Sequence, residues 1–191
     1  MKLNAQELRH GLNHGDLIKE LDDQVKYEPF RKAVGIRTDK RMKGAELVLR
    51  YFAFRDDRAN YQKPISSFLD QYSSKSRTMP KADADISGED FRLVIDRVDR
   101  ALGKLAFRIF DSDLKPTSPF NSALYDAEMI GFRETTNQKI LTGQYKPIDL
   151  LKHTLSLFGV ERFMNSIRQA TSDEQAVKYR IDSFITHLNS F

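Results

Sequence analysis

The chain has 191 residues, 40% of them hydrophobic and 30% charged, which is the composition of a globular protein with room for a proper core. It contains no cysteine, which excludes disulfide scaffolds and zinc sites built from thiolates, and no apolar run of membrane-spanning length, so we expect a cytoplasmic protein with no membrane partner. A formal charge of +4, from 31 basic and 27 acidic residues, permits a nucleic-acid partner without requiring one.

The first predicted element is a helix that begins at the start of the chain. Residues Asn4–Glu7 have the form of a capping box, and Gly11 or Gly15 is expected to end the helix. A second helix is predicted from Asp16 to about Val25, and a short element runs from Pro29 through Val34. The N-terminal part of the chain is therefore expected to be helical almost from its first residue.

Residues 43–54, KGAELVLRYFAF, predict the central packing helix. In a helix their apolar side chains cover almost the whole circumference, so the element belongs inside a packed domain. Only a strip that carries Lys43, Glu46, Arg50 and Asp57 is expected to reach water or a ligand. Glu46 and Arg50 are spaced i,i+4, which predicts a structural ion pair on this helix.

The most basic patch of the sequence precedes this helix. Its candidate nucleic-acid-binding residues are Arg31, Lys32, Arg37, Lys40, Arg41 and Lys43. Basic side chains near aromatic rings suit phosphate contact combined with base stacking. The alternative is a solvated rim of charges around aromatic residues that belong to the core, and the helical periodicity of Tyr51 and Phe52 favours burial of those two rings.

The rest of the chain is also expected to be helical. A helix follows Pro64, and residues 73–87 predict a mobile loop, which would join sub-lobes 1–75 and 86–191 within a single helical domain, 1–191. Ser87 is expected to cap a long amphipathic helix.

Further helices are predicted from Asn121, after Pro147, after Gly159, and from a cap at Thr171 or Ser172. No run of alternating strands is present. The predicted fold is therefore all-α, with about eight helices.

The common catalytic and metal-binding motifs find no support in the sequence. His10 and His14 have an i,i+4 spacing that suits metals, but no further ligand is evident, and residues 83–94 open like a calcium loop yet end in Val94 where glutamate is needed. No phosphate-binding glycine loop is present, and a cysteine nucleophile is impossible. No catalytic or metal-binding residue is assigned.

Two segments read together resemble a known family. Residues 3–9, LNAQELR, and residues 41–54, RMKGAELVLRYFAF, are similar to the distal part of the N-terminal domain of GmrSD-type restriction proteins. Residues 61–69, 121–125 and 177–181 fit the same pattern in the same order, so the similarity spans nearly the whole chain.

The resemblance implies a ParB/sulfiredoxin-like αβ lobe that hydrolyses nucleotides, followed by a helical lobe, used in bacterial phage defence and DNA restriction. The family's Asp-Gly-Gln-Gln-Arg motif lies upstream of the segment matched here, and only three residues precede Asn4. What remains is expected to be the helical lobe, with Gln6, Glu7 and Arg9 as the residues that face the nucleotide site. Glu7 and Arg9 lie on different sides of an ideal helix, so helical geometry does not place both in one pocket.

The leading hypothesis is a non-catalytic helical lobe of a GmrSD-like protein, acting with a partner that supplies the αβ lobe. It binds no cofactor of its own, and a nucleotide only together with that partner. The chain is then a truncated product, one half of a split protein or an independent helical module. The alternatives are a stand-alone module that binds DNA or another nucleic acid, and an enzyme that hydrolyses nucleoside triphosphates by itself with the help of Glu7 or Arg9.

Overall fold

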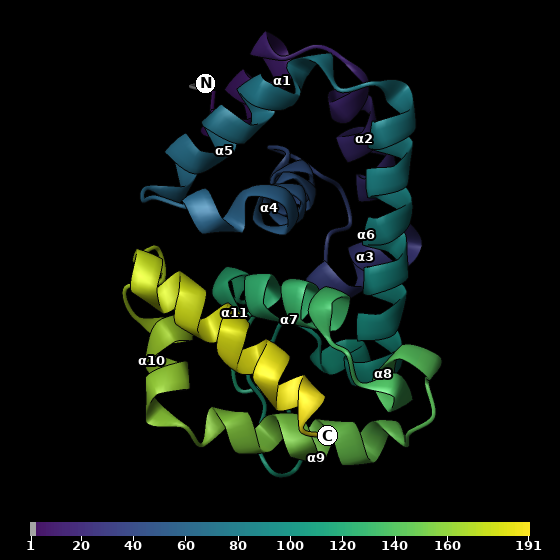
Figure 1. The fold of residues 1–191 in the computed structure, drawn as a ribbon, viewed down its shortest axis with the longest axis vertical. Coiled ribbons are helices and arrows are strands. Elements are labelled where there is room, and N and C mark those ends of the chain that lie inside the picture. The colour runs from purple at the N-terminus through teal and green to yellow at the C-terminus, as the bar shows by residue number, and fades with distance from the viewer. Residues whose placement is uncertain (1–2) are drawn as a thin grey trace. The chain divides into compact units, whose positions relative to one another are not determined.

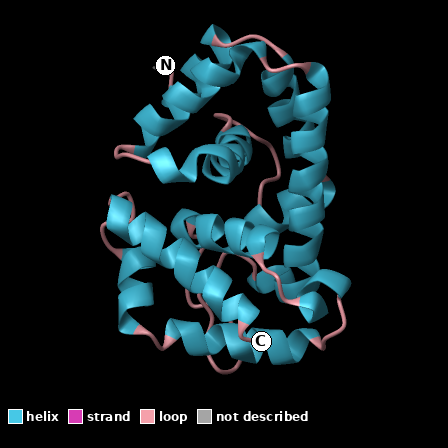
Figure 2. Ribbon diagram, in the orientation of Figure 1, coloured by secondary structure: helices cyan, strands magenta, loops and turns pink. Residues whose placement is uncertain are grey.

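The computed structural model describes residues 3–191, and within this range it contains eleven α-helices, three short 3-10 helices and no β-strand (Figure 2). One isolated β-bridge joins Phe110 to Pro116. The predicted all-α class is confirmed. The expected count of about eight helices is slightly low, because an element as short as α8 (Gln138–Thr142) cannot display a helical period.

The chain divides into two compact units, residues 1–93 and 94–191, and the boundary falls inside the long helix α6 (Lys81–Leu102). The segment 73–87, expected to be a mobile loop, is instead mainly helical. It comprises the end of α5 (Ile65–Lys75), a 3-10 turn at Ser76–Thr78 and the first turns of α6. Ser87 is therefore not a cap. Its hydroxyl donates to the Asp83 carbonyl within α6, at 2.8 Å.

The first unit is built around the predicted central helix. Its elements are α1 (Ala5–Leu12), α2 (Asp16–Val25), α3 (Glu28–Val34), α4 (Lys43–Asp57), a 3-10 turn (Arg58–Asn60), α5 and the first part of α6 (Figure 1). Helix α4 contacts α1, α2 and α5, and Val48, Leu49 and Phe52 on it are fully buried. Arg50 does not lie on an exposed strip as expected. It is only 8% exposed, and its guanidinium lies 5.9 Å from the centre of the Phe54 ring.

The second unit is organised by the extensive pairing of α7 (Ser122–Glu134) with α11 (Glu174–Asn189). The remaining part of α6, a 3-10 turn (Gly103–Leu105), α8, α9 (Pro147–Phe158) and α10 (Glu161–Arg168) complete it. Gly131 permits the close approach of α7 to α11, because a Cβ atom there would lie 2.5 Å from the Phe184 ring.

The caps of these two helices show what local sequence can and cannot reveal. The Asn121 side chain accepts hydrogen bonds from the first turn of α7, as predicted. Helix α11 is capped by Asp173, whose carboxylate accepts from Gln175 and Ala176, and not by Thr171 or Ser172. Three adjacent residues were chemically suitable caps, and the backbone position of the first helical turn decides among them.

Candidate functional site

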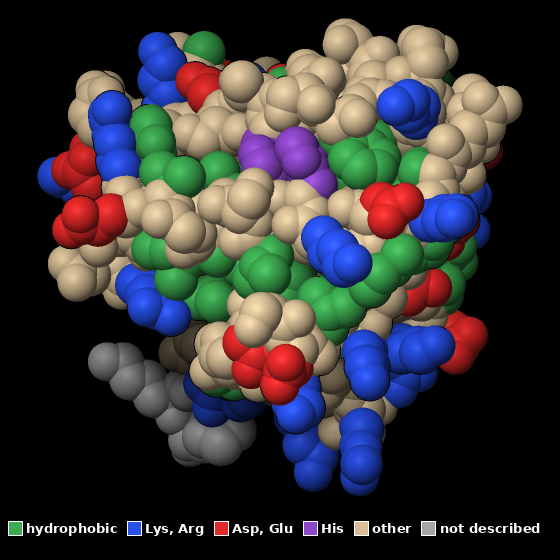
Figure 3. Space-filling model, turned by 90° about the horizontal axis from the view of Figure 1, so that it is seen from below, with side chains coloured by type: hydrophobic (Ala, Val, Ile, Leu, Met, Phe, Trp, Pro, Cys, Tyr) green, Lys and Arg blue, Asp and Glu red, His purple; other side chains and the backbone are tan. Residues whose placement is uncertain are grey.

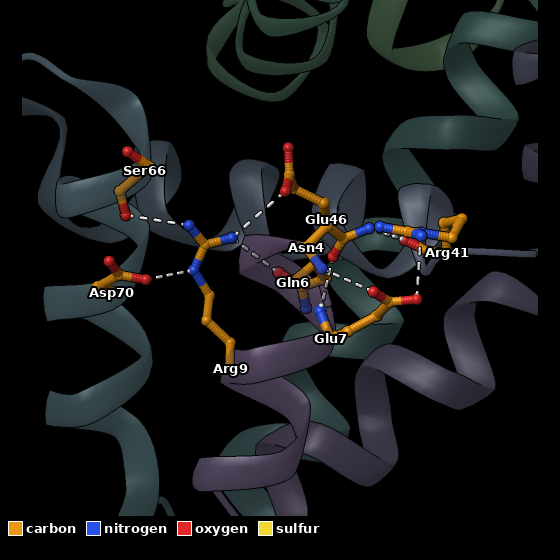
Figure 4. Close-up of polar contacts among 8 residues, drawn as sticks. All are labelled: Asn4, Gln6, Glu7, Arg9, Arg41, Glu46, Ser66 and Asp70. Atoms are coloured by element: carbon orange, nitrogen blue, oxygen red, sulfur yellow. Dashed lines mark hydrogen bonds and ion pairs between the residues drawn. The ribbon is translucent and has the colours of Figure 1, made fainter. Parts of the chain in front are cut away.

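The start of α1 forms the capping box that its sequence predicts. The Asn4 amide donates to Glu7 Oε2 at 2.7 Å, and the Glu7 amide donates to Asn4 Oδ1 at 2.8 Å. The same two side chains reach Arg41, two residues before α4, since Asn4 Nδ2 donates to the Arg41 carbonyl at 2.9 Å and Glu7 Oε1 lies 3.2 Å from Arg41 Nε. The first turn of α1 is thereby fastened to the approach to α4 (Figure 4).

Arg9 occupies a second, separate cluster on the same helix. Its guanidinium is 3% exposed and lies among groups from α1, α4 and α5 (Figure 4). Nε donates to Asp70 Oδ1 at 2.6 Å, and Nη1 donates to Gln6 Oε1 at 3.0 Å and to Glu46 Oε2 at 3.3 Å. Nη2 donates to the Ser66 carbonyl at 3.1 Å. Each guanidinium nitrogen therefore has a protein acceptor, and two of these acceptors are carboxylates from α4 and α5.

The structure brings two of the three predicted nucleotide-facing residues together and separates the third. Gln6 and Arg9 share one buried cluster, with Gln6 only 1% exposed, while Glu7 turns towards Asn4 and Arg41. Glu46 contributes its carboxylate to Arg9, a contact that its predicted pairing with Arg50 did not anticipate. Arg9, which also donates to Gln6 on its own helix, thus holds α1 against α4 and α5.

Helix α1 is inverted relative to an ordinary surface helix. Its polar residues Gln6 and Arg9 face the protein, whereas Leu8 and Leu12 are 46% and 68% exposed, and Leu3 just before the helix is 57% exposed. A surface helix normally buries its apolar stripe and exposes its polar one. The i,i+4 spacing of Leu8 and Leu12 was visible in the sequence, but it would ordinarily have predicted burial. We call Leu3, Leu8 and Leu12 the leucine face.

The predicted basic patch surrounds the connection between α3 and α4. Lys32, Arg37, Lys40 and Lys43 are exposed. Arg31 and Arg41 are partly buried and have protein contacts, Arg31 with the Arg37 carbonyl and Arg41 with Glu7. Four of the six predicted residues are therefore presented to solvent. The other two, Arg31 and Arg41, help to hold the segment between α3 and α4 in place.

The N-terminus of α4 beside this patch is already satisfied by the protein. The Asp39 carboxylate accepts from the Gly44 amide at 2.8 Å and from the Ala45 amide at 3.2 Å. Arg41 and Met42, which follow Asp39, have positive φ angles of 81° and 55°. A left-handed conformation is costly for residues other than glycine. Asp39 and the contacts of Asn4 with Arg41 hold the chain in this conformation.

The second unit contains buried charged groups that the sequence analysis did not single out. Asp126 and Arg180 form an ion pair at 2.7 Å, and both side chains are 0% exposed. Glu128 is also fully buried, where its Oε2 accepts from the Phe107 amide at 2.7 Å. Burial raises the pKa of the Glu128 carboxyl well above its ordinary value, against the opposing effects of that hydrogen bond and of Arg108. The carboxyl is therefore held in its neutral form well above the pH at which an exposed glutamate ionises.

No helix within residues 3–191 combines the length and apolar character needed to cross a lipid bilayer. The same part of the chain has no group of three histidine or acidic side chains arranged to hold a metal ion. His10, one of the histidines with metal-like spacing, has its Nε2 atom 3.1 Å from Asp22.

No protein-family model, no curated protein sequence and no solved structure matches this chain.

Proposed function

We propose that this protein is a non-catalytic helical lobe of a GmrSD-like phage-defence and DNA-restriction system, which acts through a partner that docks on α1 and supplies the αβ nucleotide-hydrolysing lobe. The observation that carries the proposal is the inverted orientation of α1. Its polar residues anchor it to α4 and α5, and its leucine face is left to solvent.

Exposure of the leucine face needs an explanation, because single exposed leucines are ordinary, whereas Leu8 and Leu12 lie one turn apart on the same side of α1 and Leu3 is exposed just before the helix. An isolated helix of eight residues is not stable in water, so α1 exists only through its contacts with the rest of the unit. The polar contacts of its first turns are made by Asn4, Glu7 and Arg9, within the segment on which the family resemblance depends. The segment therefore fits the role of a fixed platform for an apolar partner surface.

The engagement of Arg9 supports a non-catalytic role. An arginine that neutralises phosphates in a transition state must direct N–H groups at the ligand. Here Nε, Nη1 and Nη2 donate to Asp70, to Gln6 and Glu46, and to the Ser66 carbonyl. In this proposal the phosphate-binding groups come from the partner's lobe.

The test is purification of the tagged chain from its native host, followed by mass spectrometry of the retained proteins and an assay of nucleoside triphosphate hydrolysis. The proposal expects a retained protein that carries the Asp-Gly-Gln-Gln-Arg motif, with turnover by the complex and none by the chain alone. Recovery of the chain without such a protein, or turnover by the chain alone that is lost in Glu7→Gln or Arg9→Ala, contradicts it.

A second candidate function is nucleic-acid binding by the basic patch, favoured by the joint exposure of Lys32, Arg37, Lys40 and Lys43. Phosphate contacts release counterions, so affinity must fall steeply as salt rises. Fluorescence anisotropy with a DNA duplex at low and physiological salt measures this dependence. Arg37→Gln/Lys40→Gln should weaken binding, whereas the exposed Lys178→Gln on α11 should not. Binding that depends neither on salt nor on the Arg37→Gln/Lys40→Gln substitutions rules this function out.

A further inference from the structure

Two histidines in the second unit are paired face to face. His153 on α9 and His187 on α11 have ring centroids 3.9 Å apart and ring planes only 12° from parallel. Each ring also bonds the other residue's backbone, since His153 Nε2 is 2.8 Å from the His187 carbonyl and His187 Nε2 is 2.8 Å from the His153 carbonyl. Two histidine side chains are seen side by side at the surface in Figure 3 (purple). The pair is a reciprocal connection between two helices.

The carbonyl partners fix where the protons are. A carbonyl oxygen can only accept a hydrogen bond, so each Nε2 must carry a proton, and in the neutral ring Nδ1 is then the unprotonated nitrogen. Acidification adds the next proton at Nδ1. The two hydrogen bonds survive this step, but the stacked rings become cations, and like charges at this separation repel.

We propose that the histidine pair is a proton-sensitive contact that joins α9 to the last turn of α11, and that acidification releases this turn. Both rings are stacked without repulsion only when at least one is neutral. Protonation of the second ring places two imidazolium groups face to face. The connection is thus strong when the rings are neutral and weak when both are charged.

The surroundings of the His187 ring favour its neutral form. Burial of the His187 imidazole, together with repulsion from His153, lowers the pKa of His187, while its hydrogen bond to the His153 carbonyl acts in the opposite direction. A histidine with a lowered pKa in the folded state contributes stability that is fully present above its ordinary pKa of 6.5. That stability is lost as the pH falls through the lowered value.

Charged groups lie on the elements around the histidine pair. Asp149 lies four residues before His153 on α9, and Asp182 borders the same hollow of about 450 Å³ as His187. The ammonium of Lys139 on α8 lies 6.0 Å from the centre of the Phe191 ring, and the centre of that ring is 5.3 Å from the centre of the His153 ring. Further ionisable groups on α9, on the helices that contact α9 and α11, and on the segment before α9 include Lys152 on α9, Arg133 and Glu134 on α7, Glu161 and Arg162 on α10, and Tyr145 before α9.

The first experiment is an NMR titration of the full chain with labelled histidine between pH 4.5 and 8. The chain has four histidines, and the signal followed is that of the His187 ring. The proposal expects the pKa of His187 to lie below its ordinary value of 6.5, because its imidazole is buried and faces a second ring. A His187 pKa at or above 6.5 would overturn it.

The second experiment measures release of the helix. Hydrogen exchange in residues 183–191, corrected for the intrinsic pH dependence of exchange, should be at least about tenfold faster at pH 5 than at pH 7.5. The double variant His153→Gln/His187→Gln keeps an amide N–H donor at each position but cannot be charged, so it should lose this difference. His14→Gln should retain it. Equal acid-induced release in the double variant, or none in the wild type, refutes the proposal, and the titration needs no variant to fold.

Discussion

Replacement of Arg9 by methionine tests whether the buried arginine holds α1 in its inverted orientation. Methionine keeps the apolar stem of the side chain and removes the guanidinium, with its donors to Asp70, Gln6, Glu46 and Ser66. The variant therefore removes the polar anchor of α1 without opening a large cavity. The leucine face is not changed by the substitution.

The expected loss follows from the exposure of the partners that remain. Asp70 and Glu46 are 59% and 40% exposed, so water can solvate their carboxylates, and each lost ion pair costs about 0–1 kcal/mol. Gln6 is 1% exposed, and an acceptor left unpaired there costs about 1–3 kcal/mol. The sum is about 1–5 kcal/mol, which corresponds to at least about fivefold faster exchange of α1 amides if α1 opens locally.

Hydrogen exchange with mass spectrometry resolves this effect by segment. Peptides from residues 4–13 should exchange faster in Arg9→Met, while those from the centre of α4 should change little. Arg77→Met is the matched control, since the exposed Arg77 also touches α1 through the Leu12 carbonyl but is expected to cost less than about 1 kcal/mol. Unchanged exchange of α1 in Arg9→Met, or an equal effect in Arg77→Met, refutes the role assigned to Arg9.

Three further predictions concern stability. Because the pKa of the buried Glu128 is raised, its stabilising effect is full below pH 4.5 and declines as the pH rises through the raised pKa. Glu128→Gln should therefore raise the melting temperature by more at pH 7.5 than at pH 4, as measured by calorimetry at both pH values. Gly131→Ala should destabilise the protein by about 1–3 kcal/mol in urea unfolding, because the new Cβ would lie 2.5 Å from the Phe184 ring on α11. Gly11→Ala is the control: its Cβ would have no atom within 4 Å, so this variant should be neutral or more stable by up to about 1 kcal/mol. Asp126→Asn should cost about 3–5 kcal/mol by leaving Arg180 charged and buried, and Asp126→Leu/Arg180→Met should recover most of that loss in the same unfolding assay.

Features that depend on a few adjacent residues could be predicted from the sequence. The capping box at Asn4 and Glu7 needs only one helical turn, and the cap at Asn121 likewise acts on the next three residues. The central role of α4 followed from an apolar pattern that leaves almost no polar side. These features are set by local chemistry, so no tertiary information was needed.

Features that depend on distant residues could not be predicted. Arg9 and its acceptor Asp70 are 61 residues apart, and no local pattern connects them. The start of α6 at Lys81 escaped notice because its first turn is polar and is supported by an i,i+4 pair with Asp85 rather than by an apolar stripe. The leucine face shows the same limitation, since periodicity identifies an apolar side of a helix but tertiary packing decides which side is buried.

The most direct test of the proposed docking surface compares three tagged forms of the chain purified in parallel from the native host: wild type, Leu8→Glu/Leu12→Glu and Ile86→Glu. Ile86 is the matched control, because it is 62% exposed on α6, close to the 68% of Leu12. We predict that wild type and Ile86→Glu retain similar amounts of a protein with the Asp-Gly-Gln-Gln-Arg motif, and that the double variant retains at least about tenfold less, a loss of about 1.4 kcal/mol in binding. Equal retention by all three forms, or absence of such a protein from the wild-type sample, would contradict the assignment of α1 as the partner surface.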